Sequence, residues 1–246
     1  MLVAWLPVAR AQTHKSTSPV DEQKATVSVR ELQVPAKAQG AFVRGVEELA
    51  KGDATGSLRH FRRAIQEFPG FYEAYYNEGV AETQLQQTDE ALQSFQSAIN
   101  LSGGRCARAY FGYSLVLARL GRSKEAESIV RRGMEEDPSL SDGYAVLSTV
   151  LFNQNRLDDA EEAAHKALRL PNPSARSAFL TLADVHLRKG DYRSAAKDME
   201  SYLRAVGSTP CKDDAEFNQR IRKLLSEIKA KTAGQLPKGE PRVDIW

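Results

Sequence analysis

The sequence predicts an all-α fold, a solenoid of five helix-turn-helix repeats followed by a C-terminal capping helix. A period of 34 or 35 residues runs through most of the 246-residue chain, and a fixed period of this length is typical of stacked helical repeats. Within each period the apolar residues recur at helical spacing. Hydrophobic residues make up 41% of the chain and aromatic residues only 8%, which favours helices that cross at small residues over a dense aromatic core.

Independent residue types share one register along the chain. A small residue recurs in steps of 34, 35, 34 and 35 at Ser57, Ala91, Ala126, Ala160 and Ala195. An aromatic residue keeps the same step at Tyr75, Tyr110, Tyr144 and Phe179. The repeats are therefore predicted at 38–71, 72–105, 107–140, 141–174 and 176–209. The two extra residues, 106 and 175, fall in turns, where a helical array tolerates insertions.

The N-terminal residues have the features of the end of a secretory signal. Leu2 to Val8 are apolar apart from Pro7, and Ala9-Arg10-Ala11 places small residues at the two positions that a signal peptidase reads, before Gln12. No Lys or Arg precedes this short apolar stretch. We expect residues 1–11 to be a signal-peptide remnant of an exported bacterial protein, periplasmic or envelope-associated. A chance apolar start on a cytoplasmic protein is the alternative.

Residues 12–37 are predicted to be a leader without helical periodicity. The segment is rich in Ser, Thr, Lys and Gln, which favours disorder. It then passes through Val27-Ser28-Val29 and Val34-Pro35, where apolar and polar residues alternate as in an extended strand. Nothing after residue 12 is apolar for long enough to span a bilayer.

Each repeat is predicted to fold as two helices joined by a tight turn. Gly52-Asp53 and Gly190-Asp191 supply a residue suited to positive φ followed by an N-cap, and Gly121 marks the same turn in the third repeat. Pro69 and Pro138 end the second helix of their repeats. A single helix pair of this size cannot bury its apolar face alone, so the pairs are expected to stack and share a core.

The second repeat carries the residues of a known pattern, namely Tyr75, Gly79, Ala91, Phe95 and Ala98. With this pattern the chain resembles the tetratricopeptide-repeat family. The departures are Ala41 in place of the aromatic residue, Ser114, Ser148 and Ala183 in place of the glycine, and no proline at the family's usual position in the second, fourth and fifth repeats. The resemblance implies a right-handed superhelix in which the first helix of each repeat lines a concave groove, and a non-catalytic scaffold that binds another protein.

Groove positions of the family can be carried onto this sequence by counting within each repeat. They nominate Phe42, Val46, Tyr76, Asn77, Val80, Gln84, Phe111, Leu115, Arg119, Thr149, Asn153, Asp184 and Arg188. Such an apolar strip with a few polar groups suits an extended or helical peptide segment. The alternative for Phe42, Tyr76 and Phe111 is packing between neighbouring first helices. No Lys stands at the fifth position of any repeat, which argues against the subclass that clamps a C-terminal carboxylate.

The C-terminal region contains one further helix and a tail. Residues 213–232 carry Phe217, Ile221, Leu224, Leu225 and Ile228 at helical spacing, with acids in the first turn and lysines in the last. We expect this helix to cap the last repeat. Residues 233–246, with Pro237 and Pro241, are expected to be a flexible tail.

Charge and motif content exclude several classes of protein. The net charge of +2 gives no field to hold nucleic acid, and two cysteines with four histidines offer little for a metal site. His60, His165 and His186 lie at different positions of different repeats. The chain has no Gly-rich phosphate loop, nucleophile elbow or paired-histidine helix. We therefore predict no catalytic residue, cofactor or metal, and a protein that is not an enzyme.

The sequence thus predicts a protein-interaction scaffold, and two alternatives stay open. One is an accessory or regulatory subunit of an enzyme on another chain. The other is a structural component of an envelope or secretion assembly. Since one repeat backbone serves many partners, the sequence does not identify the partner.

Overall fold

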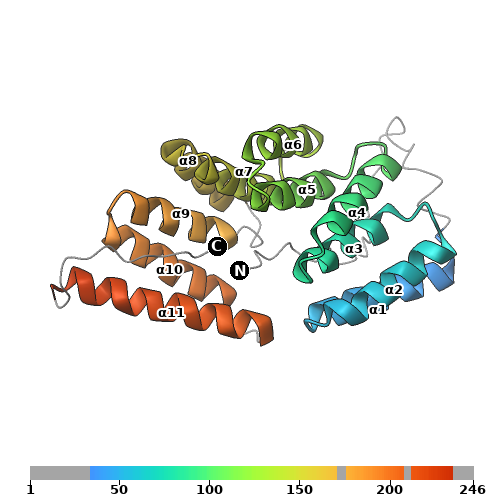
Figure 1. Cartoon of the computed structure of the whole chain (residues 1–246), viewed down its shortest axis with the longest axis horizontal. Coiled ribbons are helices and arrows are strands. Elements are labelled where there is room, and N and C mark those ends of the chain that lie inside the picture. The colour runs from blue at the N-terminus through green and yellow to red at the C-terminus, as the bar shows by residue number, and fades with distance from the viewer. Residues whose placement is uncertain (1–33, 171–175, 208–211, 235–246) are drawn as a thin grey trace, which may run out of the picture. The chain divides into compact units, whose positions relative to one another are not determined.

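A computed structural model describes residues 34–170, 176–207 and 212–234. These residues form eleven α-helices and no strand, which confirms the all-α prediction (Figure 1). The helices are α1 Ala36–Ala50, α2 Ala54–Glu67, α3 Tyr72–Gln84, α4 Thr88–Leu101, α5 Ala107–Arg119, α6 Ser123–Glu136, α7 Ser141–Asn153, α8 Leu157–Arg169, α9 Ser177–Arg188, α10 Tyr192–Val206 and α11 Lys212–Thr232.

The helices belong to two compact units, which are described separately. The N-terminal unit ends at Leu101 and carries α1–α4, and the C-terminal unit starts at Ser102 and carries α5–α11. Within the N-terminal unit α1 pairs with α2, α3 pairs with α4, and α2 packs on α3. Each pair corresponds to one of the repeats read from the sequence.

The C-terminal unit repeats the same pairing three times. The pairs are α5 with α6, α7 with α8 and α9 with α10, while α6 packs on α7 and α8 packs on α9. The first helices of these pairs also touch in order, α5 with α7 and α7 with α9. Figure 1 shows α9, α10 and α11 side by side, with α11 on the far side of α10 from α9.

One backbone feature ends the first helix of all five repeats. The fifteenth residue of each repeat has a positive φ of between 60° and 85°, at Gly52, Gln86, Gly121, Asn155 and Gly190. This left-handed conformation stops a helix and turns the chain into the next one. In the first and last repeats the aspartate after the glycine then caps the second helix, with Asp53 Oδ1 accepting from Gly56 N at 2.7 Å and Asp191 Oδ1 from Ser194 N at 3.0 Å.

Helices of the N-terminal unit cross at a glycine that faces an aromatic ring. A Cβ atom added at Gly45 would lie 2.5 Å from Phe61 Cε1, and one added at Gly79 would lie 2.9 Å from Phe95 Cδ1. Both rings are fully buried. The glycine therefore lets the ring fill the space between the paired helices.

The capping helix expected at 213–232 is α11. It buries Ile221, Leu225 and Ile228 in a cluster that includes Met199 and Tyr202 of α10. Among the described helices none is long and apolar enough to cross a membrane. The expected signal remnant, residues 12–33 of the expected leader and the tail from residue 235 lie outside the described residues. The leader was predicted to extend to residue 37, but Ala36 and Lys37 are helical, because α1 begins directly after Pro35.

Candidate interaction surface

The structure separates the nominated groove residues into three groups. Eight are buried, namely Phe42, Tyr76, Asn77, Val80, Phe111, Leu115, Thr149 and Asp184. Val46 and Gln84 are half-buried, and Arg119, Asn153 and Arg188 are exposed. Most of the apolar strip is thus enclosed by packing.

Aromatic contacts account for the two buried rings of the N-terminal unit. The centroid of the Phe42 ring lies 6.0 Å from that of Phe61 and 4.9 Å from that of Phe71. The Tyr76 ring lies 6.0 Å from the ring of Phe95. Both rings therefore take part in packing, as the alternative in the sequence analysis describes.

Two of the buried polar residues bond to their own helix. Asn77 Nδ2 donates to the carbonyl oxygen of Glu73 at 2.8 Å. The Thr149 hydroxyl lies 3.3 Å from the carbonyl oxygen of Ala145 and 3.3 Å from the Thr181 hydroxyl. The Thr149–Thr181 contact joins α7 to α9 within the C-terminal unit.

The exposed residues Arg119, Asn153 and Arg188 form one set, called here the terminal row. Each is the last residue of a first helix, α5, α7 or α9, and each occupies the thirteenth position of its repeat. Because these helices touch in that order, the three side chains lie at the same end of adjacent helices. The Arg188 guanidinium lies 5.0 Å from the centre of the Phe152 ring, a cation–π contact that orients it.

Arg119 combines exposure with partial loss of hydration. Its side chain is exposed, yet desolvation by surrounding protein atoms lowers its pKa. The guanidinium stays charged, because an arginine side chain is not deprotonated near neutral pH even where burial lowers its pKa. A cation with less water around it gains more from an opposite charge than a fully hydrated one.

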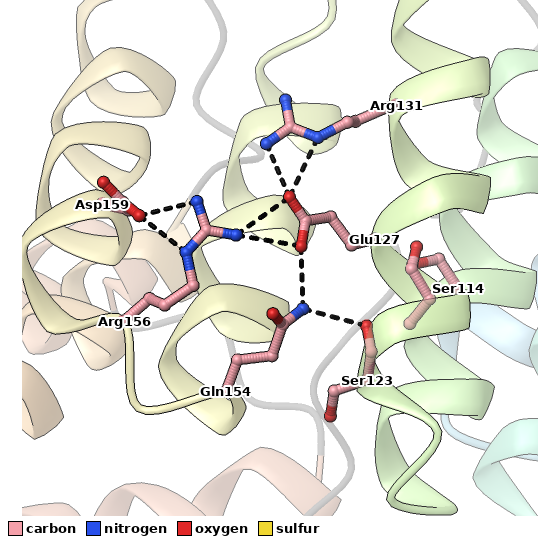
Figure 2. Close-up of polar contacts among 8 residues, drawn as sticks. Ser114, Ser123, Glu127, Arg131, Gln154, Arg156 and Asp159 are labelled. Carbon is pink, nitrogen blue, oxygen red and sulfur yellow. Dashed lines mark hydrogen bonds and ion pairs between the residues drawn. The ribbon is translucent and has the colours of Figure 1, made fainter.

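The residue after Asn153 anchors the end of α7 to α6 (Figure 2). Gln154 Nε2 donates to Glu127 Oε2 at 2.9 Å and to the carbonyl oxygen of Ser123 at 3.1 Å. The Glu127 carboxylate also binds Arg131 Nη2 at 2.7 Å and Arg156 Nη1 at 3.1 Å. Desolvation acts to raise the pKa of Glu127, but the hydrogen bonds from Arg131, Gln154 and Arg156 outweigh it and lower that pKa.

The residue after Arg188 anchors the end of α9 to α8 in the same way. Lys189 Nζ binds Asp158 Oδ1 and Glu161 Oε2, each at 2.6 Å. The hydrogen bond from Lys189 is the main cause that lowers the pKa of Glu161. Glu127 and Glu161 both occupy position 21 of their repeats, and Gln154 and Lys189 both occupy position 14. A repeated polar contact therefore anchors the ends of α7 and α9, which carry Asn153 and Arg188 of the terminal row.

His186 joins three helices, which counting along the sequence did not reveal. Its Nδ1 lies 2.7 Å from Asp198 Oδ2 of α10, and its Nε2 lies 3.5 Å from Glu161 Oε1 of α8. Burial is the main cause that raises the pKa of Asp198. Within residues 34–170, 176–207 and 212–234, no group of three or more His, Cys, Asp or Glu is placed to hold a metal ion. The histidine thus serves as a link between repeats.

Comparison with known proteins places the chain in a family. The family model described as tetratricopeptide repeat matches residues 42–104 and 146–210, which is more than half of the chain. Tetratricopeptide repeat protein 36 of Mus musculus is 34% identical over 114 residues, 45% of this chain and 59% of that protein. Protein O-mannosyl-transferase TMTC1 of Homo sapiens is 30% identical over 146 residues, 58% of this chain. The chain spans only 15% of that transferase and less than two thirds of either relative.

Solved structures show the same fold at low sequence identity. A thermophilic TPR protein of Thermus thermophilus has a TM-score of 0.66 and 21% identity, with 78% of this chain and 98% of that chain covered. PilW, a type IV pilus biogenesis factor, has a TM-score of 0.62 and 18% identity, with 84% and 96% covered. Proteins with these repeats are generally non-catalytic scaffolds that bind other proteins. By its sequence and its fold, the chain belongs to the tetratricopeptide-repeat family.

Proposed function

We propose that this chain is a non-catalytic protein-interaction scaffold whose C-terminal unit binds an extended acidic peptide segment along the terminal row. The observation that carries the proposal is the exposure of Arg119, Asn153 and Arg188 at one position of three adjacent helices. The other nominated groove residues of the C-terminal unit are buried, so the side chains of the terminal row are the ones that a partner can contact.

The chemistry of the terminal row selects the kind of segment. An Arg guanidinium binds a carboxylate through two parallel hydrogen bonds. An Asn side chain both donates and accepts, which suits a peptide backbone. Arg119 and Arg188 therefore favour acidic side chains at two points of the segment, with backbone contacts to Asn153 between them.

Helix spacing sets the distance between those acidic side chains. Neighbouring helices pack about 8–10 Å apart, so Arg119 and Arg188, two helices apart, are separated by about 16–20 Å. An extended peptide rises about 3.3 Å per residue. The preferred segment has two acidic residues about five or six positions apart.

Selection from a random-peptide display library on the full chain tests this proposal. We expect enrichment of segments with acids at that spacing. Reversing both charges, with Arg119→Glu and Arg188→Glu, should weaken binding of the enriched peptides at least about tenfold, the effect of losing about 1.4 kcal/mol. The matched control reverses two exposed arginines of α10, with Arg193→Glu and Arg204→Glu. Peptides without acidic preference, or equal binding by both double variants, would exclude the proposal.

We propose further that the protein is exported, on the basis of Leu2 to Val8 and the Ala9-Arg10-Ala11 site. N-terminal sequencing of the chain purified from its native source should then begin at Gln12. A chain that retains Met1 would contradict export and favour the cytoplasmic alternative.

Export would also favour a role in an envelope or secretion assembly over a role as an accessory subunit of an enzyme. The structural likeness to PilW, which is named a pilus biogenesis factor, is consistent with such a role but shows only the fold. Cofractionation with the envelope supports the assembly role, and copurification with an active enzyme supports the accessory role.

A further inference from the structure

Helix α1 has an open face where the other first helices are covered. Positions 3, 6 and 10 of the first repeat are Gly40, Val43 and Glu47, and all three are exposed, Val43 by 39%. The same positions are buried in the first helices of the second, fourth and fifth repeats. They are Ala74, Asn77 and Ala81 in α3, Gly143, Val146 and Val150 in α7, and Ala178, Thr181 and Val185 in α9.

The covering element in those repeats is the preceding second helix. α2 packs on α3, α6 on α7 and α8 on α9. A Cβ atom added at Gly143 would lie 2.8 Å from Met134 of α6, whereas one added at Gly40 would meet no atom within 4 Å. The face of α1 therefore has the shape of a helix-packing surface, without a helix against it among the described residues.

The charges on α1 are arranged to complement themselves. Glu47 lies within the open face, and Lys37 and Arg44 lie along one edge of it, on the helical wheel. If two α1 helices cross antiparallel about Val43, Glu47 of each copy comes level with residue 39 of the other, two residues or about 3 Å along the helix axis from Lys37. The two-fold axis then forms the same acid–base contact twice.

We propose that this chain forms a homodimer in which the open face of α1 packs antiparallel against the open face of α1 in a second copy. Gly40 allows close approach of the two backbones, and Val43 contacts Val43 at the crossing. A 15-residue helix is about 22 Å long, so the contact is at the small end of stable interfaces. Small contacts of this kind are weak and transient, so a dissociation constant on the order of 10 μM is taken as the centre of the range to be tested. This inference is independent of the terminal row.

Sedimentation velocity of the full chain over concentrations that span this value tests the dimer. The wild-type chain should shift from monomer to dimer, and Val43→Glu should raise the dissociation constant at least about tenfold by burying a charge at the crossing. Leu120→Glu is the matched control, because Leu120 is the other large apolar residue exposed in the described part of the chain, and it should leave the dimer unchanged. Circular dichroism establishes that both variants keep their helices.

Charge reversal tests the antiparallel arrangement. Glu47→Lys should weaken the dimer, and the double variant Lys37→Glu with Glu47→Lys should restore it, because the contact is re-formed with opposite signs. A wild-type chain that stays monomeric at every concentration would overturn the proposal. So would a dimer that Val43→Glu leaves intact, or a double variant that is no tighter than Glu47→Lys.

Discussion

At positions 8 and 24 of the repeat, the residues where the paired helices cross differ between the two units. In the N-terminal unit a glycine faces a phenylalanine ring, as Gly45 with Phe61 and Gly79 with Phe95. The corresponding pairs in the C-terminal unit are Ser114 with Val130, Ser148 with Ala164 and Ala183 with Met199, and all six of these residues are fully buried. When the second helix of a pair has a phenylalanine at this crossing, the first helix has a glycine. When the second helix has a smaller aliphatic residue, the first helix has a serine or an alanine, which fills the remaining space. The departures from the family glycine are thus compensated across the helix pair.

Each serine at a crossing also satisfies its own hydroxyl group. Ser114 Oγ donates to the carbonyl oxygen of Ala126 at 2.7 Å, and Ser148 Oγ donates to that of Ala145 at 2.7 Å. A buried hydroxyl without a partner would destabilise the fold. The C-terminal unit therefore replaces glycine with serine without leaving a polar group unsatisfied at these two crossings.

The largest effect is expected from emptying a ring-filled crossing. Phe95→Ala leaves a cavity between α3 and α4 and should lower the free energy of unfolding by about 3–5 kcal/mol. Val130→Ala at the corresponding position of the C-terminal unit removes fewer atoms and should lower it less. Urea unfolding followed by circular dichroism measures both. Equal losses would show that the two kinds of crossing do not differ in packing.

A smaller effect is expected from overfilling the same crossing. Gly79→Ala places a Cβ atom 2.9 Å from Phe95 Cδ1 and should destabilise the chain by about 1–3 kcal/mol. Phe95→Val in the same chain makes room for the added methyl group and reproduces the kind of crossing found in the C-terminal unit. A double-mutant cycle on unfolding free energies should show the double variant less destabilised than the sum of the single variants. Strict additivity would refute the compensation.

The crossing of α3 and α4 also carries a polar pair that α5 and α6 lack. Ser94 Oγ donates to Glu82 Oε2 at 2.7 Å, where the third repeat has Leu117 and Ile129. Desolvation by burial raises the pKa of Glu82 to about 6 from an ordinary 4.5. Since the folded state then holds the proton more tightly than the unfolded state, the stabilisation from this group is full below pH 4.5 and is lost as pH rises through about 6.

Glu82→Gln should remove that pH dependence. The rise in pKa corresponds to about 2 kcal/mol, so the wild-type chain should lose up to about that much stability relative to the variant between pH 4.5 and pH 7. Urea unfolding of both chains across this range measures the difference. If the wild-type chain instead gains stability relative to the variant as pH rises, the pH dependence has the opposite sign. That result would contradict a raised pKa of Glu82.

The smallest effect is expected from the serine hydroxyl at the crossing of α5 and α6. Ser114→Ala removes the bond to the carbonyl oxygen of Ala126 and should lower the free energy of unfolding by about 0.5–1.5 kcal/mol. Ser128→Ala on the exposed face of α6 is the control, and it should change stability by less than about 0.5 kcal/mol. If the two variants unfold at the same urea concentration, the hydroxyl bond contributes nothing.

Much of the fold could be predicted because the repeat register fixes which residues face the core. Gly52, Gly121 and Gly190 marked the turns in three repeats, and the structure gives each a positive φ. Gln86 and Asn155 adopt the same conformation without a glycine. The turn at Gln86 could be located only from the register, because glutamine rarely adopts a positive φ, whereas asparagine adopts it more often than most residues.

The candidate surface was harder to predict from sequence for a physical reason. Apolar residues at helical spacing suit both a groove and a core, so spacing alone did not decide the place of Phe42. Phe71 decides it, because this residue lies just before α3 and puts its ring 4.9 Å from that of Phe42. The link through His186 was missed for a similar reason, since Asp198 and Glu161 come from two different helices.

A polar contact joins position 21 of one repeat to position 14 of the next. This contact affects whether a whole repeat can be gained or lost. The repeat at 141–174 carries both halves, with Gln154 bonded to Glu127 before it and Glu161 bonded to Lys189 after it. A tandem duplication of these residues would place Glu161 of one copy beside Gln154 of the next, which is the pairing that Glu127 and Gln154 already make. A whole repeat can therefore be gained or lost between α6 and α9 while every junction keeps a matched polar pair.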